Sequence, residues 1–329
     1  MCETWTSVRQ LRSSLDVPPD SSLQSLLDRL VELELLEREG PRTDPRVTAM
    51  STLGPWNPEA GFFHTASRDV AFATARQAAR FAAQQAKRWP MPPVVKEYGG
   101  AKDIELPTPR RDGEFPTVLR GRRTWRRFSS KPITREDLAT LLGLTSGVQQ
   151  WVAAKPRNLA LKTSPSGGAR HSIETYVVIR DVEGLRPGIY HYAPDRHTLE
   201  KIRGPVSLKR MREYLPNSGY FAKASAMVFF TSIFERILWR YPYSRAYRAA
   251  LVEAGHLCQT FCLTATWLGL APYCVMGLAD SIIEQDLGID GIRESVLYCA
   301  GVGRRPAGSD WAPLPRGTLK VRRNSLLSR

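Results

Sequence analysis

The sequence predicts an α+β or α/β fold in which a central sheet is flanked by helices. Two segments with a helical spacing of apolar residues, Thr134–Leu144 and Ala246–Leu268, alternate along the chain with β-rich segments. The predicted strands are Glu174–Val182, Ala226–Ser232 and Glu294–Val302. A chain of 329 residues, 42% of them hydrophobic, can bury a sizeable core, and its length favours one large domain beside a smaller one.

The first fifty residues predict a small helical domain. Helices are expected over Val8–Leu15 and Ser21–Leu36, and Gly40 with Pro41 ends the second one. The stretch LLDRLVELELLEREG resembles the recognition helix and wing of winged helix-turn-helix domains. A plain helical hairpin fits the same periodicity, so residues 1–50 are interpreted as winged-helix-like on this resemblance alone.

A less regular region separates this domain from the rest. An alanine-rich helix is predicted from Ser67 to Trp89, and the five prolines of Pro90–Pro109 are typical of a linker or strap. We therefore expect a helix and proline-rich strap over residues 51–115, the main domain over 116–310 and a basic tail over 311–329. The tail is either a solvated segment or a binding arm.

The net charge of +15 favours an anionic partner without identifying it. No nucleic-acid partner is expected, because glutamates crowd the would-be recognition helix and would repel phosphate: Glu32, Glu34, Glu37 and Glu39. No run approaches eighteen apolar residues, and the first twenty positions lack the apolar segment of a signal peptide. We therefore expect a cytoplasmic protein without a membrane partner.

Five cysteines without CxxC spacing argue against a disulfide framework and against structural zinc. They are expected to be reduced core thiols, with no bound metal. Cys258 and Cys262 stand four residues apart on one predicted helix face, which would suit a metal or redox pair. The sequence supplies no further ligand beside them.

Two clusters indicate a ligand that carries phosphate. The segment Arg120–Phe128 (RGRRTWRRF) holds five arginines in eight positions, and its groups suited to phosphate are Arg122, Arg123, Thr124 and Arg126. Nucleic acid and FMN phosphate fit this cluster about equally. The turn Thr163–Ala169 (TSPSGGA) favours a cofactor, since paired glycines let backbone amides approach a ligand closely. It has neither GxGxxG nor Walker spacing, which argues against Rossmann binding and phosphoryl transfer.

Three further features belong to the candidate site. Pro272–Gly277 (PYCVMG) is expected to form a turn after the long helix, and Arg304 and Arg305 follow the last predicted strand. His256, within the long helix, is either a core histidine satisfied by a carbonyl or a catalytic residue.

Several ordered motifs resemble one known family. The arginine cluster resembles the Arg-x-Ser/Thr-x-Lys/Arg-x-Phe flavin motif of the nitroreductase superfamily. The stretch PSGGARHSIETYVVIRDVEGLRPGIYHYAPDRHTLEKI resembles the SagB-type dehydrogenase branch, with its PSGGA turn, Glu-x-Tyr strand and Gly-x-Tyr-x-Tyr hairpin at Gly188, Tyr190 and Tyr192. Arg245–Pro272 matches the same branch in register. The resemblance covers roughly Arg120–Arg305 and implies an α+β nitroreductase-like fold with a mixed or antiparallel sheet.

This resemblance implies an FMN-dependent enzyme that oxidises thiazoline or oxazoline rings to azoles in a ribosomally made peptide. The FMN phosphate and ribityl chain would be held by Arg122, Arg123, Thr124 and Arg126, helped by Arg304 or Arg305. The isoalloxazine would be contacted by Pro165, Ser166 and Gly167, with backbone amides from Met276 and Gly277 near its N5 edge. Members of the superfamily are homodimers, so both copies would build each site.

One position departs from the family pattern. In the family, a Lys-Tyr pair before the RAYR motif takes the proton while hydride passes to the flavin. The pair here is Arg240 and Tyr241, and an arginine stays protonated near neutral pH. Tyr241 or Tyr243 would then take the proton, with Arg240 lowering its pKa by charge proximity. The other interpretation of WRYPY is a packed aromatic segment.

Three functions remain open at this point. The first is the peptide azoline dehydrogenase, whose N-terminal domain would hold a leader peptide and whose partner would be a cyclodehydratase. The second is an FMN- and NAD(P)H-dependent reductase of small molecules or dehydroamino acids. The third is a flavin-free peptide-binding or regulatory protein that kept the fold.

Overall fold

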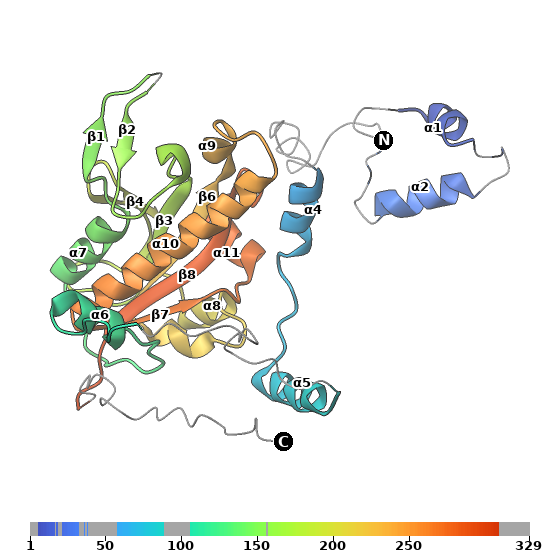
Figure 1. Cartoon of the computed structure of the whole chain (residues 1–329). Helices are drawn as coiled ribbons and strands as arrows, with labels where there is room; N and C mark the ends of the chain where they lie inside the picture. Colours follow the sequence, from blue (N-terminus) through green and yellow to red (C-terminus); the bar gives the residue numbers. More distant parts are fainter. Residues whose placement is uncertain are drawn as a thin grey trace. The chain divides into compact units, whose positions relative to one another are not determined.

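A computed structural model describes residues 6–16, 18, 22–32, 36, 38, 58–88, 106–155 and 157–308. The chain divides into two compact units, Met1–Thr52 and Leu53–Arg329. The first contains α1 (Val8–Ser14) and α2 (Leu23–Glu32), close to the predicted positions (Figure 1). The predicted wing, most of the proline-rich linker and the basic tail lie outside the described residues.

Six strands form the sheet of the second unit, in the order β5-β4-β3-β6-β8-β7. Every neighbouring pair is antiparallel, so the sheet is the antiparallel one of the two predicted types, mixed or antiparallel. The strands are β3 (Ile173–Ile179), β4 (Gly188–Ala193), β5 (Thr198–Arg203), β6 (Ala226–Ile233), β7 (Leu270–Val275) and β8 (Glu294–Arg304).

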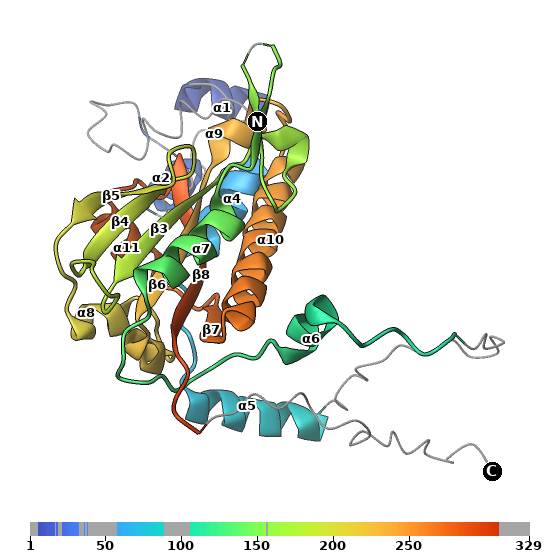
Figure 2. The same cartoon turned by 90° about the vertical axis from the view of Figure 1, so that its left-hand side faces the viewer.

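Helices cover both faces of this sheet (Figures 1 and 2). One face packs against α7 (Arg135–Ser146) and α10 (Arg245–Trp267), the other against α8 (Leu208–Glu213) and α11 (Asp280–Leu287). Side chains of β3 alternate between the two cores, so that Val177 faces α10 and Val178 faces α11. Because both faces are buried, β3 is an unbroken buried run rather than an apolar–polar alternation.

The segment Pro272–Gly277, predicted as a turn, contains most of an edge strand instead. Residues Leu270–Val275 pair with β8 as β7, and only Met276 and Gly277 follow the strand. Proline is tolerated here because an edge strand has one side without ladder hydrogen bonds. A residue outside the sheet also bonds to this strand, since the Trp125 amide donates to the Pro272 carbonyl at 2.9 Å.

The helix predicted over Ser67–Trp89 was also wrong in its extent. Helix α4 (Pro58–Ala66) ends before it, and α5 (Ala75–Arg88) occupies only its later part. Residues 67–74 are not helical because their polar groups bond elsewhere: the Asp69 carboxylate accepts from the Ser281 amide, and Asn217 donates to the carbonyl groups of Phe72 and Ala73.

The 3-10 turn η1 (Gly167–Ala169) lies within the predicted turn Thr163–Ala169. The sequence did not predict the hairpin β1 (Gln150–Val152) and β2 (Leu159–Leu161), α6 (Glu114–Gly121), α9 (Phe234–Leu238) or the 3-10 turn η2 (Gly219–Lys223). In the part of the chain that the structure describes, no helix combines the length and the apolar character needed to cross a membrane.

His64 attaches α4 to the long helix α10. The side chain is 4% exposed, with Nδ1 3.0 Å from the Tyr247 hydroxyl and Nε2 2.8 Å from the Gly291 carbonyl. The carbonyl can only accept, so Nε2 donates and Nδ1 accepts, which uses both nitrogens of a neutral ring. Burial lowers the pKa of His64 from 6.5 to about 4.

We expect His64 to make the fold acid-sensitive. The unfolded chain protonates this ring near pH 6.5 and the folded chain only near pH 4, so its contribution is complete above pH 6.5 and falls as pH drops towards 4. The loss amounts to about 3 kcal/mol. In denaturant unfolding, the free energies of unfolding of wild type and His64→Gln should therefore approach each other as pH falls from 6.5 to 4. The control His256→Gln, at an exposed site, should show the same pH dependence as wild type. Parallel pH dependences of wild type and His64→Gln would contradict the assignment.

Gly301 of β8 is required by the ring of Tyr273 on β7. The two residues are paired in the ladder, and a Cβ at position 301 would overlap that fully buried ring, which also stacks on Phe221 at 4.0 Å. Gly301→Ala should lower the free energy of unfolding by about 1–3 kcal/mol. Gly204→Ala, with open space around it, is the matched control. Equal denaturation midpoints for the two variants would show that the strand pair has room to adjust.

Candidate active site

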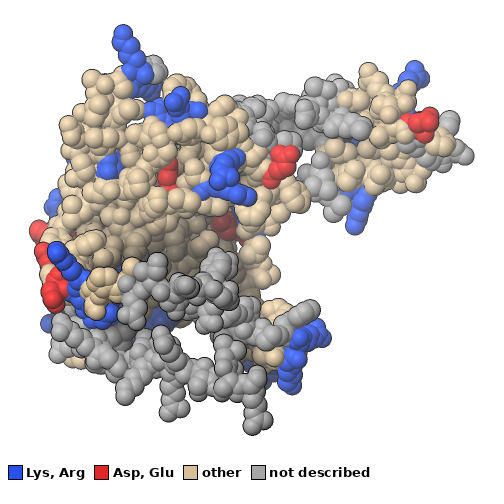
Figure 3. Space-filling model, in the orientation of Figure 1, with Lys and Arg blue, Asp and Glu red and all other residues tan. Residues whose placement is uncertain are grey.

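The arginine segment is fixed to the end of the sheet that carries Arg304 and Arg305. Beyond α6, the Ser129 amide donates to the Arg304 carbonyl at 2.9 Å, as the Trp125 amide does to Pro272. Phe128 lies over Gly303, whose Cβ would come within 2.8 Å of its ring. The structure therefore brings two of the predicted clusters together. Figure 3 shows basic side chains near α6 and others dispersed over the visible face.

The arginines at this end divide into two groups. Arg123 donates to the carbonyl groups of Arg120 and Arg122, Arg304 to Pro132, and Arg305 to Leu270 and Thr266. These three brace the backbone. Arg122 is half-buried and Arg126 is exposed, and neither forms a side-chain hydrogen bond or ion pair with another described residue. Their charges are available to an anion.

The carboxylate of Glu253, on α10, fixes the glycine turn by hydrogen bonds. No role was predicted for this residue from the sequence. This carboxylate is 3% exposed and accepts four hydrogen bonds. The donors are Ser166 Oγ at 2.6 Å, the Gly167 amide at 3.0 Å, Ser172 Oγ at 2.8 Å and the Ser172 amide at 3.2 Å. A buried carboxylate is costly without such partners. A glutamate on an otherwise apolar helix face was the available signal.

Tyr241 lies directly on this turn. A Cβ at Gly168 would come within 3.2 Å of the Tyr241 hydroxyl, and one at Gly167 within 3.4 Å of its ring. Gly168 also has a φ of +60°, so this position suits glycine in both conformation and space. Arg240 shares the contact, since its Cγ would lie 3.4 Å from the same Gly168 Cβ.

Tyr243 and His256 are placed differently from Tyr241. Tyr243 is 48% exposed, with its ring centroid 6.0 Å from that of Tyr241. His256 is exposed, and its Nδ1 is 3.3 Å from the Pro165 carbonyl. The interpretation of His256 as a core histidine was therefore wrong about burial, although a carbonyl does lie beside it.

The turn and Arg305 contact well-separated positions of one helix. Glu253 holds the turn, whereas Arg305 donates to the Thr266 carbonyl, thirteen residues further along α10. At 1.5 Å per residue this is about 20 Å. Arg305 bonds to Leu270 at the start of β7, whereas Met276 and Gly277 follow the end of that strand. The Met276 side chain is 68% exposed. Within one chain, the turn and Arg305 are thus held apart along α10.

Titratable groups that the sequence did not identify surround the turn. Glu174 forms an ion pair with Arg236 and lies 2.6 Å from His191, whose pKa is raised chiefly by that bond. Lys162 is half-buried, near the charges of Glu174, Arg236 and Glu253, and its burial lowers the pKa of its amine. Nothing in the local sequence of Lys162 indicated this environment, because its neighbours come from other elements.

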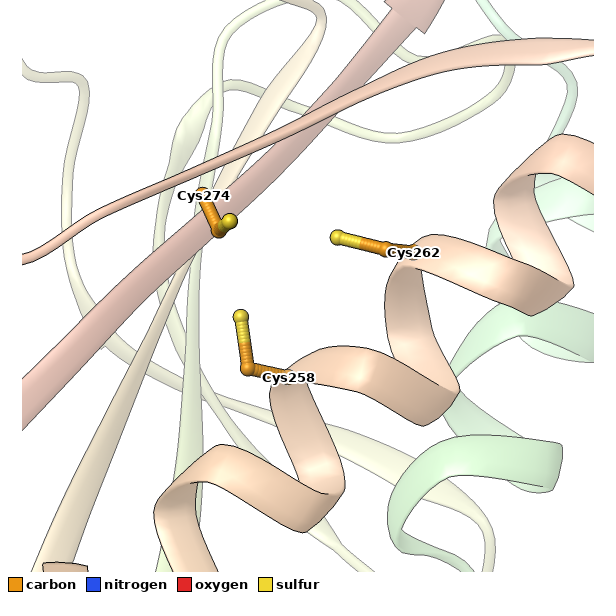
Figure 4. A group of neighbouring side chains, drawn as sticks. All are labelled: Cys258, Cys262 and Cys274. Carbon is orange, nitrogen blue, oxygen red and sulfur yellow. The ribbon is translucent and has the colours of Figure 1, made fainter. Parts of the chain in front are cut away.

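A third cysteine joins the pair on α10. The sulfur atoms of Cys258, Cys262 and Cys274 all lie within 4.8 Å of one another, with Cys274 reaching across from β7 (Figure 4). Hydrogen bonds from Cys258 and Cys262 hold the pKa of Cys274 below its usual value, and Arg122 adds a nearby positive charge. The expectation that no further ligand accompanies the pair was therefore wrong.

Comparison with known proteins places this geometry in a family. Residues 119–304 match the nitroreductase family. MJ1384 of Methanocaldococcus jannaschii, named as a nitroreductase, is 30% identical over 63% of this chain and 98% of its own length. In the structure of the Escherichia coli microcin synthetase McbBCD complex, one chain aligns over 80% of this chain and 99% of its own length, at 20% identity and a TM-score of 0.55, which shows a shared fold.

Two further relatives are named as processing proteins. The trifolitoxin-processing protein TfxB of Rhizobium leguminosarum bv. trifolii is 38% identical over 44% of this chain and 39% of its own length. The microcin B17-processing protein McbC of Escherichia coli is 30% identical over 38% of this chain and 48% of its own length. The matched region thus spans less than half of either relative. Since the family match itself extends over more than half of the 329 residues, the chain belongs to the nitroreductase family.

Proposed function

We propose that this chain is an FMN-dependent dehydrogenase that oxidises thiazoline or oxazoline rings of a ribosomally made peptide to azoles. Family membership supports redox chemistry, and the similarity to TfxB and McbC, both named for processing peptide products, supports a peptide substrate. The observation that carries the proposal is the contact of Tyr241 with the glycine turn, because it puts a proton-accepting group beside a backbone built for close approach.

The arginine segment suits the phosphate of FMN. Arg122 and Arg126 present guanidinium groups that no described side chain neutralises, and Thr124 lies between them with a hydroxyl donor. Backbone bonds to β7 and β8 hold the segment in place, so little ordering entropy would be lost on binding. When bound, FMN would accept the hydride equivalent of ring oxidation.

Two copies of the chain would complete each site. The separation of about 20 Å along α10 favours arginines from one copy and the glycine turn, with Pro165, Ser166 and Gly167, from the other. Met276 and Gly277 would then offer their backbone amides to the ring edge. A homodimer is therefore part of the proposal.

Proton transfer is assigned to Tyr241, with Arg240 as the neighbouring positive charge. The Arg240 guanidinium carbon lies 6.0 Å from the Tyr241 ring centroid. Lys162, which directly follows β2, brings an amine near Glu253, the carboxylate that holds the glycine turn. The peptide would be presented by a leader held in the N-terminal unit and would come from a cyclodehydratase partner.

Arg126→Ala should release FMN. Removal of one charge-assisted contact to a phosphate is expected to weaken flavin binding by about tenfold or more, because such bonds contribute about 1.5–3 kcal/mol. Flavin fluorescence during equilibrium titration measures this affinity. Arg127→Ala, an exposed neighbour outside the proposed set, is the control. Unchanged affinity in Arg126→Ala would remove this residue from the site.

Tyr241→Phe should slow flavin reduction by substrate far more than it weakens FMN binding. Loss of a positioned proton acceptor costs roughly 10²- to 10⁴-fold in rate. Tyr243→Phe is the matched control, because the Tyr243 ring is 48% exposed and the substitution leaves Tyr241 in place. Stopped-flow reduction with an azoline peptide would separate the two variants, and equal rates in Tyr241→Phe and wild type would reject the role of Tyr241.

A further inference from the structure

Three thiols converge on one point between α10 and β7. Cys258 and Cys262 lie on successive turns of the inner helix face, and Cys274 faces them from the strand (Figure 4). Cys258 and Cys262 are buried, and Cys274 is half-buried. Cysteine often fills a core as a small apolar residue. Here, however, all three sulfur atoms point towards a shared space, although the Cys262 thiol also lies 4.0 Å from the Tyr273 carbonyl.

The dimensions of the cluster fit a thiophilic ion. The three sulfur atoms are at most 4.8 Å apart, so a central point lies no more than about 2.8 Å from each. Zinc–sulfur bonds are about 2.3 Å long. Each sulfur would need to move inward by at most about half an ångström, which a cysteine χ1 rotation can supply without backbone movement.

The charges around the cluster also fit. Zn²⁺ with three thiolates carries a net charge of −1, and Arg122 places its positive charge near Cys262 and Cys274. The Tyr298 hydroxyl hydrogen-bonds to the Cys274 sulfur, in the manner of the outer partners that orient metal ligands. Thiolate ligands select zinc and other soft ions over magnesium or calcium.

We propose that Cys258, Cys262 and Cys274 form a zinc site that ties α10 to β7, with water at a fourth position on the side of half-buried Cys274. The three ligands lie outside the set of residues assigned to FMN, although Arg122 is shared with that set, and zinc would join the two elements rather than take part in ring oxidation. It would stabilise the packing of α10 on the strand that precedes Met276 and Gly277. The sequence alone could not suggest it, because its third ligand comes from a different element.

Zinc titration of the reduced full-length chain tests the site. With Zn²⁺ as the only added metal and a chromogenic chelator as competitor, one zinc per chain should bind, and Cd²⁺ in its place should give ultraviolet thiolate-to-metal absorption. Cys262→Ser should weaken zinc binding by about a hundredfold. Cys299→Ser is the matched control, because Cys299 is a buried cysteine on β8 outside the cluster.

A second measurement needs no variant. One equivalent of Zn²⁺ should slow iodoacetamide alkylation of Cys274 in wild type, followed by peptide mass spectrometry. Substoichiometric zinc, equal affinity in Cys262→Ser and Cys299→Ser, or recovery of a disulfide within the cluster in place of bound zinc would each overturn the proposal. Both measurements are made with and without FMN, so that a failure of flavin binding and a failure of zinc binding are seen separately.

Discussion

The hydrogen bonds that Glu253 accepts are the interaction on which the candidate site depends. One buried carboxylate of α10 holds Ser166, Gly167 and Ser172, so it joins the glycine turn and the start of β3 to the long helix. The Ser166 hydroxyl oxygen also accepts from the His171 amide at 2.8 Å, which closes the turn. Because the carboxylate would be costly to bury without these donors, turn and helix stabilise each other. Tyr241 rests on the surface that results.

Helix α10 positions the other chemically distinctive groups as well. Its first half carries Glu253, its middle carries Cys258 and Cys262, and its last turn offers the Thr266 carbonyl to Arg305. A single rigid element therefore sets the spacing between the turn, the thiol cluster and the arginine segment. The turn and Arg305 are held thirteen residues apart along this helix, which is the reason that the proposed function draws on a second copy of the chain.

The long, strongly patterned elements were predictable from the sequence. β6 and β8 begin at the predicted residues, and α7 and α10 lie within two residues of their predicted ends, because apolar periodicity is maintained over the whole element. β7 was missed since Pro272 and Gly277 are typical of turns, and only its place at the sheet edge makes proline acceptable. The start of the helix predicted from Ser67 was wrong because Asp69 bonds to α11, a contact that no local pattern contains.

The candidate site was predictable only where a motif is local. The arginine segment, the glycine turn and Tyr241 were identified from the sequence, and the structure places Tyr241 on the turn. Glu253, Lys162 and Cys274 gained their significance from partners distant in sequence. Likewise, the division of the arginines into braces and available cations follows from carbonyl groups of other elements, which residue type cannot reveal.

Anaerobic mixing of an azoline-containing peptide with the FMN-loaded chain is the most direct test of the central claim. Flavin absorption should bleach as the peptide loses two hydrogen atoms per ring, with no nicotinamide cofactor present. The amount of flavin reduced should equal the amount of azoline ring oxidised. Bleaching that requires NAD(P)H and leaves the azoline ring unchanged, or a purified chain that retains no FMN, would contradict the assignment as a peptide azoline dehydrogenase.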